Sequence, residues 1–430
     1  MTNKCEYSSF KVAVGTSTKK DAYAAGKEVA ESTLKRLGCK PKLVFLFCTI
    51  HYAKKNGLKQ FLNGVWSVLE EGTILVGGTI AGFQNQDGCF ARGATILAIN
   101  YPHMSISVGY GTNVRRNHKK AARKCYKMLK KDLKDEHENK MLFSFISSAE
   151  GPEVTSFGSN FNVNSKILGR LTLPLFYILQ KVFQKGLGTE QEFLEVMKKY
   201  LPDYYFLHSS TIDSINYGTS YQFFDKKVLA ESGIALAIDL DIKTEINYEL
   251  AADIIGIDFK VTKISRNKKI IKKINDKPAL KELMKLMEWP SEDLKQNRWL
   301  TNSLIYPMGF YKNNKIICRG IAMILGNYLG CFGKVENENI FMLKLSQSKI
   351  IESVEKTLPK KEPIMGFLIY CVMIQLFLGI KVFEVNKILK NYFKEKPFLV
   401  IYTGGEGMCD VNEEPYFLNE SIISTILYED

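Results

Sequence analysis

One carboxylate near the end of the chain stands among glycines, where it could meet a ligand. Glu406 belongs to the stretch Phe398-Leu-Val-Ile-Tyr-Thr-Gly-Gly-Glu-Gly407. The apolar run is typical of a buried strand, and the glycine pair that ends at Gly405 indicates a turn where the backbone approaches another group closely. A carboxylate in such a place must be solvated, paired or directed at a ligand. We therefore expect Glu406 to bind an ammonium group, with structural pairing or helix N-capping as the alternative.

Two further polar turns are expected after apolar runs earlier in the chain. Gly77-Gly78-Thr79 follows the run 73–76, and its backbone N–H groups could hold a carboxylate or a phosphate. No Gly-Lys-Ser/Thr follows and the spacing is not GxGxxG, so neither common nucleotide-binding loop is present. The alternative is a tight joint between strand and turn. Ser209-Ser210 would be the corresponding turn of a second unit, with hydroxyl groups in place of bare backbone.

Cys371 ends another apolar run, at the position where α/β sheets present functional side chains. As a nucleophile this thiol would need a basic partner, but the five histidines all lie at or before His208. A Cys–His pair would therefore cross between domains, and the alternative is an inert buried thiol. The histidines are too scattered for a metal cluster, and no CxxC or CxxH spacing occurs. We expect no enzyme activity, no metal and no cofactor.

Length and composition narrow the class of protein. The chain has 430 residues, which is too many for one core, so two or more domains are expected. A hydrophobic content of 46% excludes a disordered chain, and the net charge of +14 favours anionic partners, although a lysine-rich surface also keeps proteins soluble. No apolar leader and no run of about 20 apolar residues occurs. Nine cysteines without disulfide-like spacing fit a reducing compartment, so we expect a cytoplasmic protein without a membrane partner.

Hydrophobic periodicity predicts the elements that position these turns. Strands are expected over 10–15, 43–48, 73–78, 94–99, 104–109 and 141–146, and helices over 22–37, 57–70 and 117–133. Ser17 or Thr18 is the expected N-cap of the first helix, and Gly38 ends it. Strands 94–99 and 104–109 should be neighbours in a meander. The mixed order predicts an α/β (mixed α+β) fold with two domains, in which helices flank mixed β-sheets.

Two segments in the first half of the chain have similar sequences. Ile74–Ala81 and Tyr204–Asp213 each consist of an apolar run, two small residues and Thr-Ile, and an aliphatic strand follows each of them. This pattern predicts an internal duplication within residues 1–240, with chance similarity at turns as the alternative. Lysine then becomes frequent between Lys260 and Lys277, where the character of the chain changes and we place a domain boundary.

A basic helix is predicted over 117–133, and Arg115 and Arg116 precede it. It could bind nucleic acid or another anionic surface. Tyr126 is its one aromatic residue, so a solvated outer face is the favoured interpretation and nucleic acid is not an expected partner.

With these segments in view, the chain resembles the FIST family, whose members combine a FIST-N and a FIST-C domain. At the front, the motifs that carry the resemblance are Asp21-Ala22 and Ala25-Gly26 within 15–37, the run 41–47, and Val76-Gly-Gly-Thr-Ile-Ala-Gly82. At the back they are Gly366-Phe-Leu-Ile-Tyr-Cys371, the pair Gly405-Glu406, and Tyr416-Phe-Leu-Asn419. The resemblance implies a FIST-N-like sensory domain over 1–245 and a FIST-C-like domain over 246–430.

The resemblance further implies a cytoplasmic sensory protein of signal transduction that binds a small ligand, for which amino acids are suggested. Because no kinase or cyclase segment occurs, a signal would pass through a separate partner. The chain departs from the family at Ser209-Ser210, where a Gly-Gly pair is usual, and at 372–375, where an Arg is common. The expected ligand cleft is formed by Gly77, Gly78, Thr79, Ser209, Ser210, Cys371, Gly405, Glu406 and Asn419. The alternatives are an adaptor that binds a protein or nucleic acid through the basic face, and a cysteine-dependent enzyme.

Overall fold

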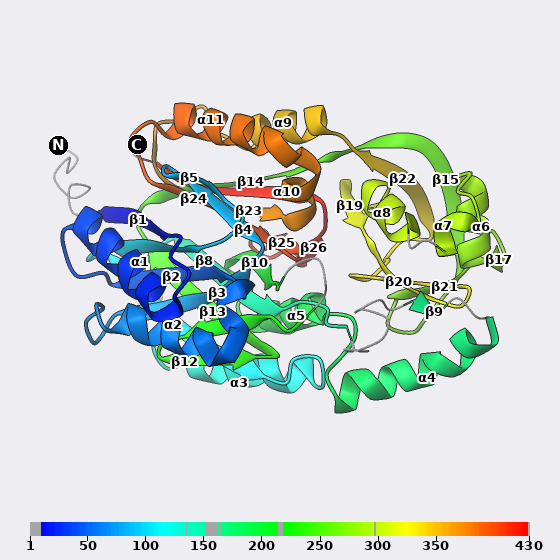
Figure 1. Cartoon of the computed structure of the whole chain (residues 1–430), viewed down its shortest axis with the longest axis horizontal. Coiled ribbons are helices and arrows are strands. Elements are labelled where there is room, and N and C mark those ends of the chain that lie inside the picture. Colours follow the sequence, from blue (N-terminus) through cyan, green and yellow to red (C-terminus); the bar gives the residue numbers. More distant parts are fainter. Residues whose placement is uncertain are drawn as a thin grey trace.

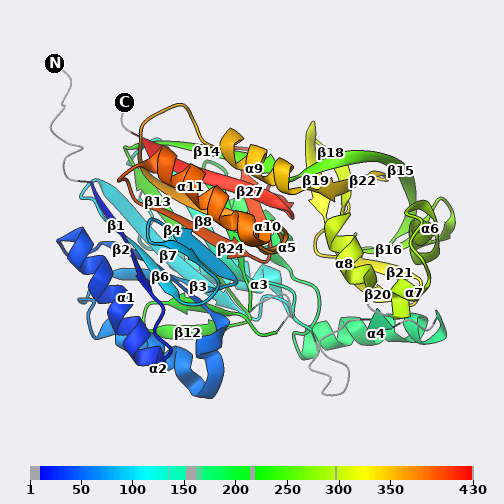
Figure 2. The same cartoon turned by 45° about the horizontal axis from the view of Figure 1, so that its top comes forward.

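The computed structural model describes residues 10–134, 136–151, 162–163, 166–213, 218–295 and 298–428. Within these residues the strands form three six-stranded sheets and one nine-stranded sheet. The six-stranded sheets lie together in the larger part of the molecule, and the nine-stranded sheet belongs to a smaller lobe beside them (Figure 1, Figure 2). The expected mixed α+β class is confirmed. No helix in the described residues is long and apolar enough to cross a membrane.

The larger part consists of repeated units with one topology. Each repeat runs strand, helix, strand, helical segment, strand, hairpin and last strand. Repeat 1 comprises β1 (Lys11–Ser17), α1 (Ala22–Leu37), β2 (Leu43–Thr49), α2 (Gly57–Trp66), β3 (Ile74–Ile80), β4 (Gly82–Asn85), β5 (Gly88–Phe90) and β6 (Ala94–Asn100). Repeat 2 comprises β7 (Met104–Thr112), α3 (His118–Leu129), β8 (Asn139–Ser147), α5 (Glu190–Tyr200), β10 (Tyr205–Thr211), β11 (Tyr221–Phe224), β12 (Lys227–Ala230) and β13 (Ser232–Leu240).

The duplication expected in the first half of the chain extends to a third repeat, which the similarity between the two sequence segments did not predict. Repeat 3 comprises β14 (Lys243–Leu250), α9 (Gln347–Lys356), β23 (Pro363–Cys371), α10 (Val372–Leu378), α11 (Val382–Phe393), β24 (Phe398–Thr403), β25 (Glu406–Cys409), β26 (Tyr416–Leu418) and β27 (Ser421–Tyr428). In every repeat the last strand lies between the first and the second, and the second and third run parallel. The expected meander of 94–99 and 104–109 is therefore wrong, because β6 and β7 belong to different sheets.

The hairpin of each repeat completes the sheet of a different repeat. The hairpin β4–β5 pairs with β24, the hairpin β11–β12 pairs with β3, and the hairpin β25–β26 pairs with β10. The exchange is cyclic, since repeat 1 extends repeat 3, repeat 2 extends repeat 1, and repeat 3 extends repeat 2. Strand pairs thus cross the boundary placed at residue 245, and the division into 1–245 and 246–430 stays a prediction.

Equivalent phenylalanines from the three repeats fill the centre of this assembly. Phe45, Phe143 and Phe367 lie in β2, β8 and β23, the second strand of each repeat. Each lies four residues before the end of its strand. Their ring centroids are 5.4 Å apart for Phe45 and Phe143, 5.2 Å for Phe45 and Phe367, and 5.7 Å for Phe143 and Phe367. All are buried, so the sheets share one apolar core. Helices cover the outer faces: α1 and α2 on repeat 1, α3 and α5 on repeat 2, and α9 to α11 on repeat 3.

The first helix shows how local sequence sets these elements. Asp21 is the N-cap of α1, with its side chain accepting a hydrogen bond from the Ala24 backbone N–H at 2.8 Å. The sequence had pointed to Ser17 or Thr18, but Ser17 ends β1 and its hydroxyl donates to Glu28. Gly38 ends the helix as expected, in the left-handed conformation with φ 70°.

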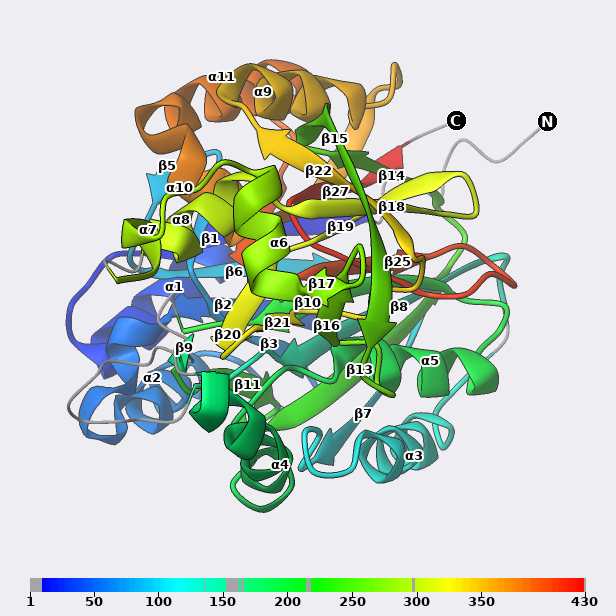
Figure 3. The same ribbon diagram turned by 90° about the vertical axis from the view of Figure 1, so that its right-hand side faces the viewer.

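The smaller lobe is inserted between β14 and α9 and also receives a segment of repeat 2. The insertion comprises β15 (Ala252–Ile264), β16 (Ile270–Ile274), β17 (Lys277–Pro278), α6 (Ala279–Leu286), α7 (Glu292–Lys295), α8 (Arg298–Ile305), β18 (Met308–Lys312), β19 (Lys315–Arg319), β20 (Ile321–Leu325), β21 (Tyr328–Cys331) and β22 (Asn339–Leu345). From repeat 2 come β9 (Asn162–Val163), which pairs with β20, and α4 (Lys166–Val182). Figure 3 looks onto this lobe, with the long β15 running across it.

The basic helix is present as α3, and its faces are divided as the periodicity predicts. Ala121, Ala122, Cys125 and Leu129 are buried, whereas its lysines are exposed. Arg115 does not belong to this exposed face. Its side chain is buried, forms an ion pair with Glu150 and donates to the Ser148 carbonyl oxygen at 2.6 Å. The exposed lysines of α3 still form a basic face, so binding of a partner through this face remains a prediction.

Candidate functional site

The carboxyl ends of the parallel strands meet where the repeats exchange their hairpins. The residue after each third strand donates a backbone hydrogen bond to the neighbouring repeat. Ala81 donates to the Tyr402 oxygen at 3.0 Å, Ile212 to the Thr79 oxygen at 3.0 Å, and Gly404 to the Ser210 oxygen at 3.1 Å. We call this meeting point the junction. Its cyclic bonding draws side chains from distant segments of the chain to one place.

Glu406 lies at the junction, within β25 rather than in a loop. It is fully buried, and its Oε1 accepts a hydrogen bond from Thr403 Oγ1 at 3.1 Å while Oε2 accepts one from Ser421 Oγ at 3.0 Å. Burial, with the nearby Glu420 adding to it, holds the pKa of the Glu406 carboxyl well above its usual range. Burial therefore favours the protonated form of the side chain, and both of its oxygens accept hydrogen bonds within the protein.

Gln222 occupies the same place in repeat 2 that Glu406 occupies in repeat 3. Its Nε2 donates to Thr211 Oγ1 at 2.6 Å, and its Oε1 accepts from the Ser232 backbone N–H at 3.2 Å. Thr211 and Thr403 both end a third strand, and Ser232 and Ser421 both begin a last strand. This correspondence supports the structural alternative for Glu406, in which the side chain ties the hairpin to the strands around it.

We predict that Glu406→Gln changes the free energy of unfolding by less than about 1 kcal/mol at pH 5, because glutamine already performs the equivalent task at Gln222. Urea denaturation of the variant and the wild-type protein measures the difference. Glu406→Leu is the matched comparison, since it removes the acceptor of the buried Ser421 hydroxyl and leaves Thr403 Oγ1 only the Gly405 oxygen at 3.4 Å, and it should cost about 2 kcal/mol or more. Equal losses in both variants would contradict the interpretation.

Like Ser209, Glu420 lies at the junction with a buried side-chain oxygen that no described residue satisfies. It is 1% exposed, and its Oε2 has no hydrogen-bond partner among the described residues. Burial raises the pKa of Glu420 to about 8, and a contact with the Cys371 thiol opposes that shift. Its backbone has φ 53°, the left-handed conformation that non-glycine residues adopt rarely and that often marks functional positions. A strained, buried carboxyl with a free oxygen is suited to meet a polar ligand.

Two small hollows flank Gly404 at the junction. One has a volume of about 30 Å³ and is lined by Glu420, Cys371, Asn419 and neighbouring apolar side chains. The other, of about 10 Å³, is lined by Glu190, Ser148 and Phe417 among others. Gly404, Ile212 and Phe332 line both hollows. Each hollow therefore has room for one or two water molecules, and the side chains of Ile212 and Phe332 lie between them.

Glu190 supplies a second buried carboxyl on the far side of Gly404. Burial raises the pKa of Glu190 to about 7, and Lys269 is the strongest opposing influence. Ser210 Oγ donates to Glu190 Oε1 at 3.3 Å and also lies 3.0 Å from His208 Nε2. Burial lowers the pKa of His208 to about 3, so the imidazole is neutral and links the Ser144 hydroxyl to Ser210.

The structure brings most of the expected site residues together. Ser210 and Gly405 are joined by a backbone hydrogen bond of 2.8 Å, and Ser209 lies opposite Glu406 in the β10–β25 ladder. Cys371 and Asn419 line the larger hollow, where the Asn419 side chain also accepts from the Gly320 N–H at 3.3 Å. Burial raises the pKa of the Cys371 thiol far above its ordinary value, which disfavours the nucleophilic thiolate.

No glycine turn forms at 77–79, and these residues reach the junction through the Thr79 backbone oxygen, which accepts from the Ile212 N–H at 3.0 Å. These residues lie inside β3, and a Cβ on Gly77 would overlap the Leu46 carbonyl oxygen, so glycine there permits close strand packing. Gly78 lies against Tyr221, and Thr79 Oγ1 accepts from the Tyr221 backbone N–H at 3.0 Å. None of these side chains lines either hollow, whereas Glu420, Glu190, Ile212 and Phe332, which sequence reasoning missed, do.

Fold and site together define a repeat-built α+β protein whose repeats meet at a junction with two small hollows. No group of three or more His, Cys, Asp or Glu residues suited to a metal ion occurs among the described residues. The model of the FIST N domain family matches residues 42–277. Because this match spans more than half of the chain, the protein belongs to the FIST N domain family. FIST domains are associated with signal transduction and ligand sensing.

The other comparisons add little to this assignment. No curated protein matches the chain. Among solved structures, a cyanuric acid hydrolase from A. caulinodans aligns over 98% of this chain and 99% of its own, with 7% identity and a TM-score of 0.36. A similarity at this level supports no conclusion about fold or function. The FIST-C-like assignment of 246–430 stays a prediction.

Proposed function

We propose that the protein is a cytoplasmic sensor that binds a small molecule with an ammonium group, such as an amino acid, at the junction. The observation that carries the proposal is the free Oε2 of buried Glu420, which lies on a hollow among residues of two repeats. An ammonium group donates hydrogen bonds that such an oxygen can accept, and Glu190 provides a second acceptor beyond Gly404. Membership of a ligand-sensing family supports the same reading.

Binding requires a rearrangement, because the two hollows are too small for an amino acid. Ile212 and Phe332 line both hollows, so a shift of these side chains would merge them into one site. Ile212 belongs to the cyclic bonding of the junction, and Phe332 lies in the smaller lobe just after β21. A ligand would therefore alter how the lobe sits on the repeats, and a separate signalling partner would recognise that change. The raised pKa of Cys371 supports a sensor rather than an enzyme.

The expected result is that an amino acid or another primary amine raises the melting temperature of the wild-type protein and that Glu420→Gln abolishes the effect. Affinity should rise from pH 6 to pH 8. Burial raises the pKa of Glu420 to about 8, so the unbound carboxyl is protonated below that pH and must lose its proton to pair with an ammonium group. Thermal-shift screening at saturating concentrations, followed by calorimetry at several pH values, measures both effects.

The matched control is Glu231→Gln. Glu231 has the same backbone conformation, with φ 51°, and precedes the last strand of repeat 2 as Glu420 precedes that of repeat 3, but it does not line either hollow. This variant should keep the response to the ligand. No stabilisation by any amine, or a response that Glu420→Gln leaves intact, would refute the proposal.

A further inference from the structure

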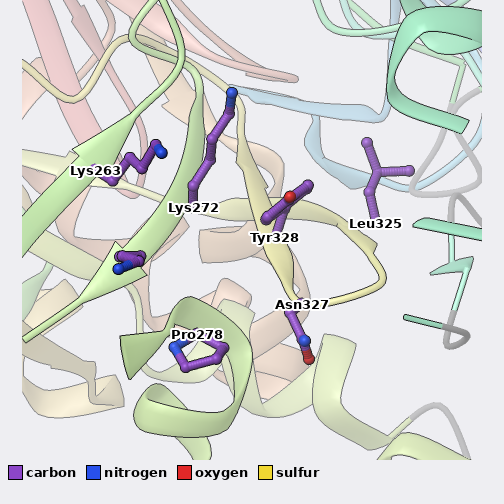
Figure 4. Close-up of a pocket in the computed structure, with 7 residues that line it drawn as sticks. Lys263, Lys272, Pro278, Leu325, Asn327 and Tyr328 are labelled. Carbon is purple, nitrogen blue, oxygen red and sulfur yellow. The ribbon is translucent and has the colours of Figure 1, made fainter. Parts of the chain in front are cut away.

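A cavity of about 260 Å³ lies in the smaller lobe, away from the junction. It is lined by Lys263, Lys272, Lys273, Pro278, Leu325, Asn327 and Tyr328. Figure 4 shows Lys263 and Lys272 near one end, Pro278 and Asn327 near the other, and Tyr328 between them. We call it the lysine pocket. It shares no lining residue with the hollows at the junction.

A β-bulge gathers the lysines of this pocket. In the ladder between β15 and β16, Lys263 lies opposite Lys273, and the next pair is Ile264 with Ile271. Lys272 is therefore the extra residue of β16, which the ladder leaves unpaired. Regular alternation would direct Lys272 and Lys273 to opposite faces of the sheet, but a bulge re-aims a side chain, and here both lysines line the same cavity.

The part of the chain that the structure describes supplies no counter-ion to the three ammonium groups. Among the described residues, none of the three lysines makes an ion pair or a side-chain hydrogen bond, and no carboxylate lines the pocket. Their neighbours in sequence are paired: Lys260 with Glu338 at 2.9 Å, Lys269 with Glu192 at 2.8 Å, and Lys277 with Glu282 at 3.4 Å.

The lysines with an ion-pair partner and those without one belong to the same basic segment. Between Lys260 and Lys277 the chain has eight basic residues and one acidic residue, Asp276, which does not line the pocket. Like charges that converge without a counter-ion repel one another, and a bound anion removes that repulsion. The lysine-rich segment therefore does more than mark a change in composition, because three of its lysines line a cavity that could hold an anion.

The structure assigns to the lysine pocket a small organic phosphate that carries at least two phosphate groups and a planar ring, of which a nucleoside diphosphate is the simplest representative. Lys263 and Lys272 at one end match the phosphate charges, since Lys is a common phosphate ligand. At the other end the Tyr328 ring and Pro278 offer flat apolar surface, and the Asn327 side chain offers both a donor and an acceptor to the edge of a ring.

Isothermal titration calorimetry at low ionic strength tests this assignment with ADP, inorganic pyrophosphate and adenosine as probes. ADP should bind more tightly than either pyrophosphate or adenosine, and added salt should weaken its binding. Lys263→Gln and Lys272→Gln should each weaken ADP binding about tenfold, the usual value of a hydrogen bond to a charged group. Tyr328→Ala should weaken ADP binding while leaving pyrophosphate unaffected.

Lys260→Gln is the matched control, because it removes one charge from the same strand, outside the pocket. It should leave the affinity for ADP unchanged. Lys263 is exposed, so the Lys263→Gln protein is expected to fold even if the change at half-buried Lys272 disturbs the bulge. The assignment is overturned by absent ADP binding at millimolar concentration, by an equal loss in Lys260→Gln, or by pyrophosphate binding as tightly as ADP.

Discussion

Phe143→Ala is expected to lower the free energy of unfolding by about 3–5 kcal/mol, the usual cost of removing a buried phenylalanine ring. Phe143 is 4% exposed and touches the equivalent rings of both other repeats, Phe45 and Phe367. Because the sheets around these rings share strands between repeats, no sheet can move inward alone. The cavity that the missing ring leaves will therefore not be filled readily. Urea denaturation followed by circular dichroism measures the loss.

The control for this prediction is Phe383→Ala. Phe383 lies in α11 and is 62% exposed, so the substitution should change stability by no more than about 0.5 kcal/mol. If Phe143→Ala cost as little as the control, the three rings would not form the shared core described above.

The stability of the wild-type protein should fall as the pH rises from about 4.5 to 8, and Glu420→Gln should make that fall shallower. In the folded protein burial raises the pKa of Glu420 to about 8, whereas the ordinary value of a glutamate side chain is 4.5. Between these values the folded state keeps a proton that the unfolded state releases, so rising pH favours unfolding. At 1.36 kcal/mol per pKa unit, the share of Glu420 is on the order of 4–5 kcal/mol.

Denaturation midpoints at half-unit steps of pH measure this effect. Below pH 4.5 the variant and the wild-type protein should differ little, because the carboxyl is protonated in both states. The stability difference in favour of the variant should then grow up to pH 8 and remain constant above it. Burial also raises the pKa of Glu190, to about 7, and that of Glu406 well above its usual range, so a slope of the same sign remains in the variant. Parallel curves for the two proteins would show that Glu420 ionises normally in the folded state.

The sequence was informative wherever a signal is local. Apolar periodicity located β1, α1, β2 and β3, and Gly38 marked the end of α1, because each depends on residues within one turn or strand. The neighbours of a strand are a different matter. Nothing in the run 94–99 states that it pairs with β1 and β2 rather than with the next strand, since the partner is chosen by contacts distant in sequence.

The candidate site shows the same division. Cys371, Glu406 and Asn419 could be selected because polar residues at the ends of buried strands are visible in sequence. The sequence predicts a turn at Gly77, because glycine serves both turns and close strand packing and only the position of the Leu46 carbonyl decides between them. Glu420 could not be selected, because its burial, its left-handed backbone and its free oxygen all arise from the assembled repeats.

The exchange of hairpins determines when each sheet can receive its last strands during translation. The sheet that begins with β7 contains strands made early, yet it lacks its outermost pair until the ribosome has passed residue 418. Likewise, the hairpin β4–β5 has no neighbour until β24 has been made, more than 300 residues later. A nascent chain must therefore carry open sheet edges for most of its translation, which is the interval in which a chaperone would need to shield them.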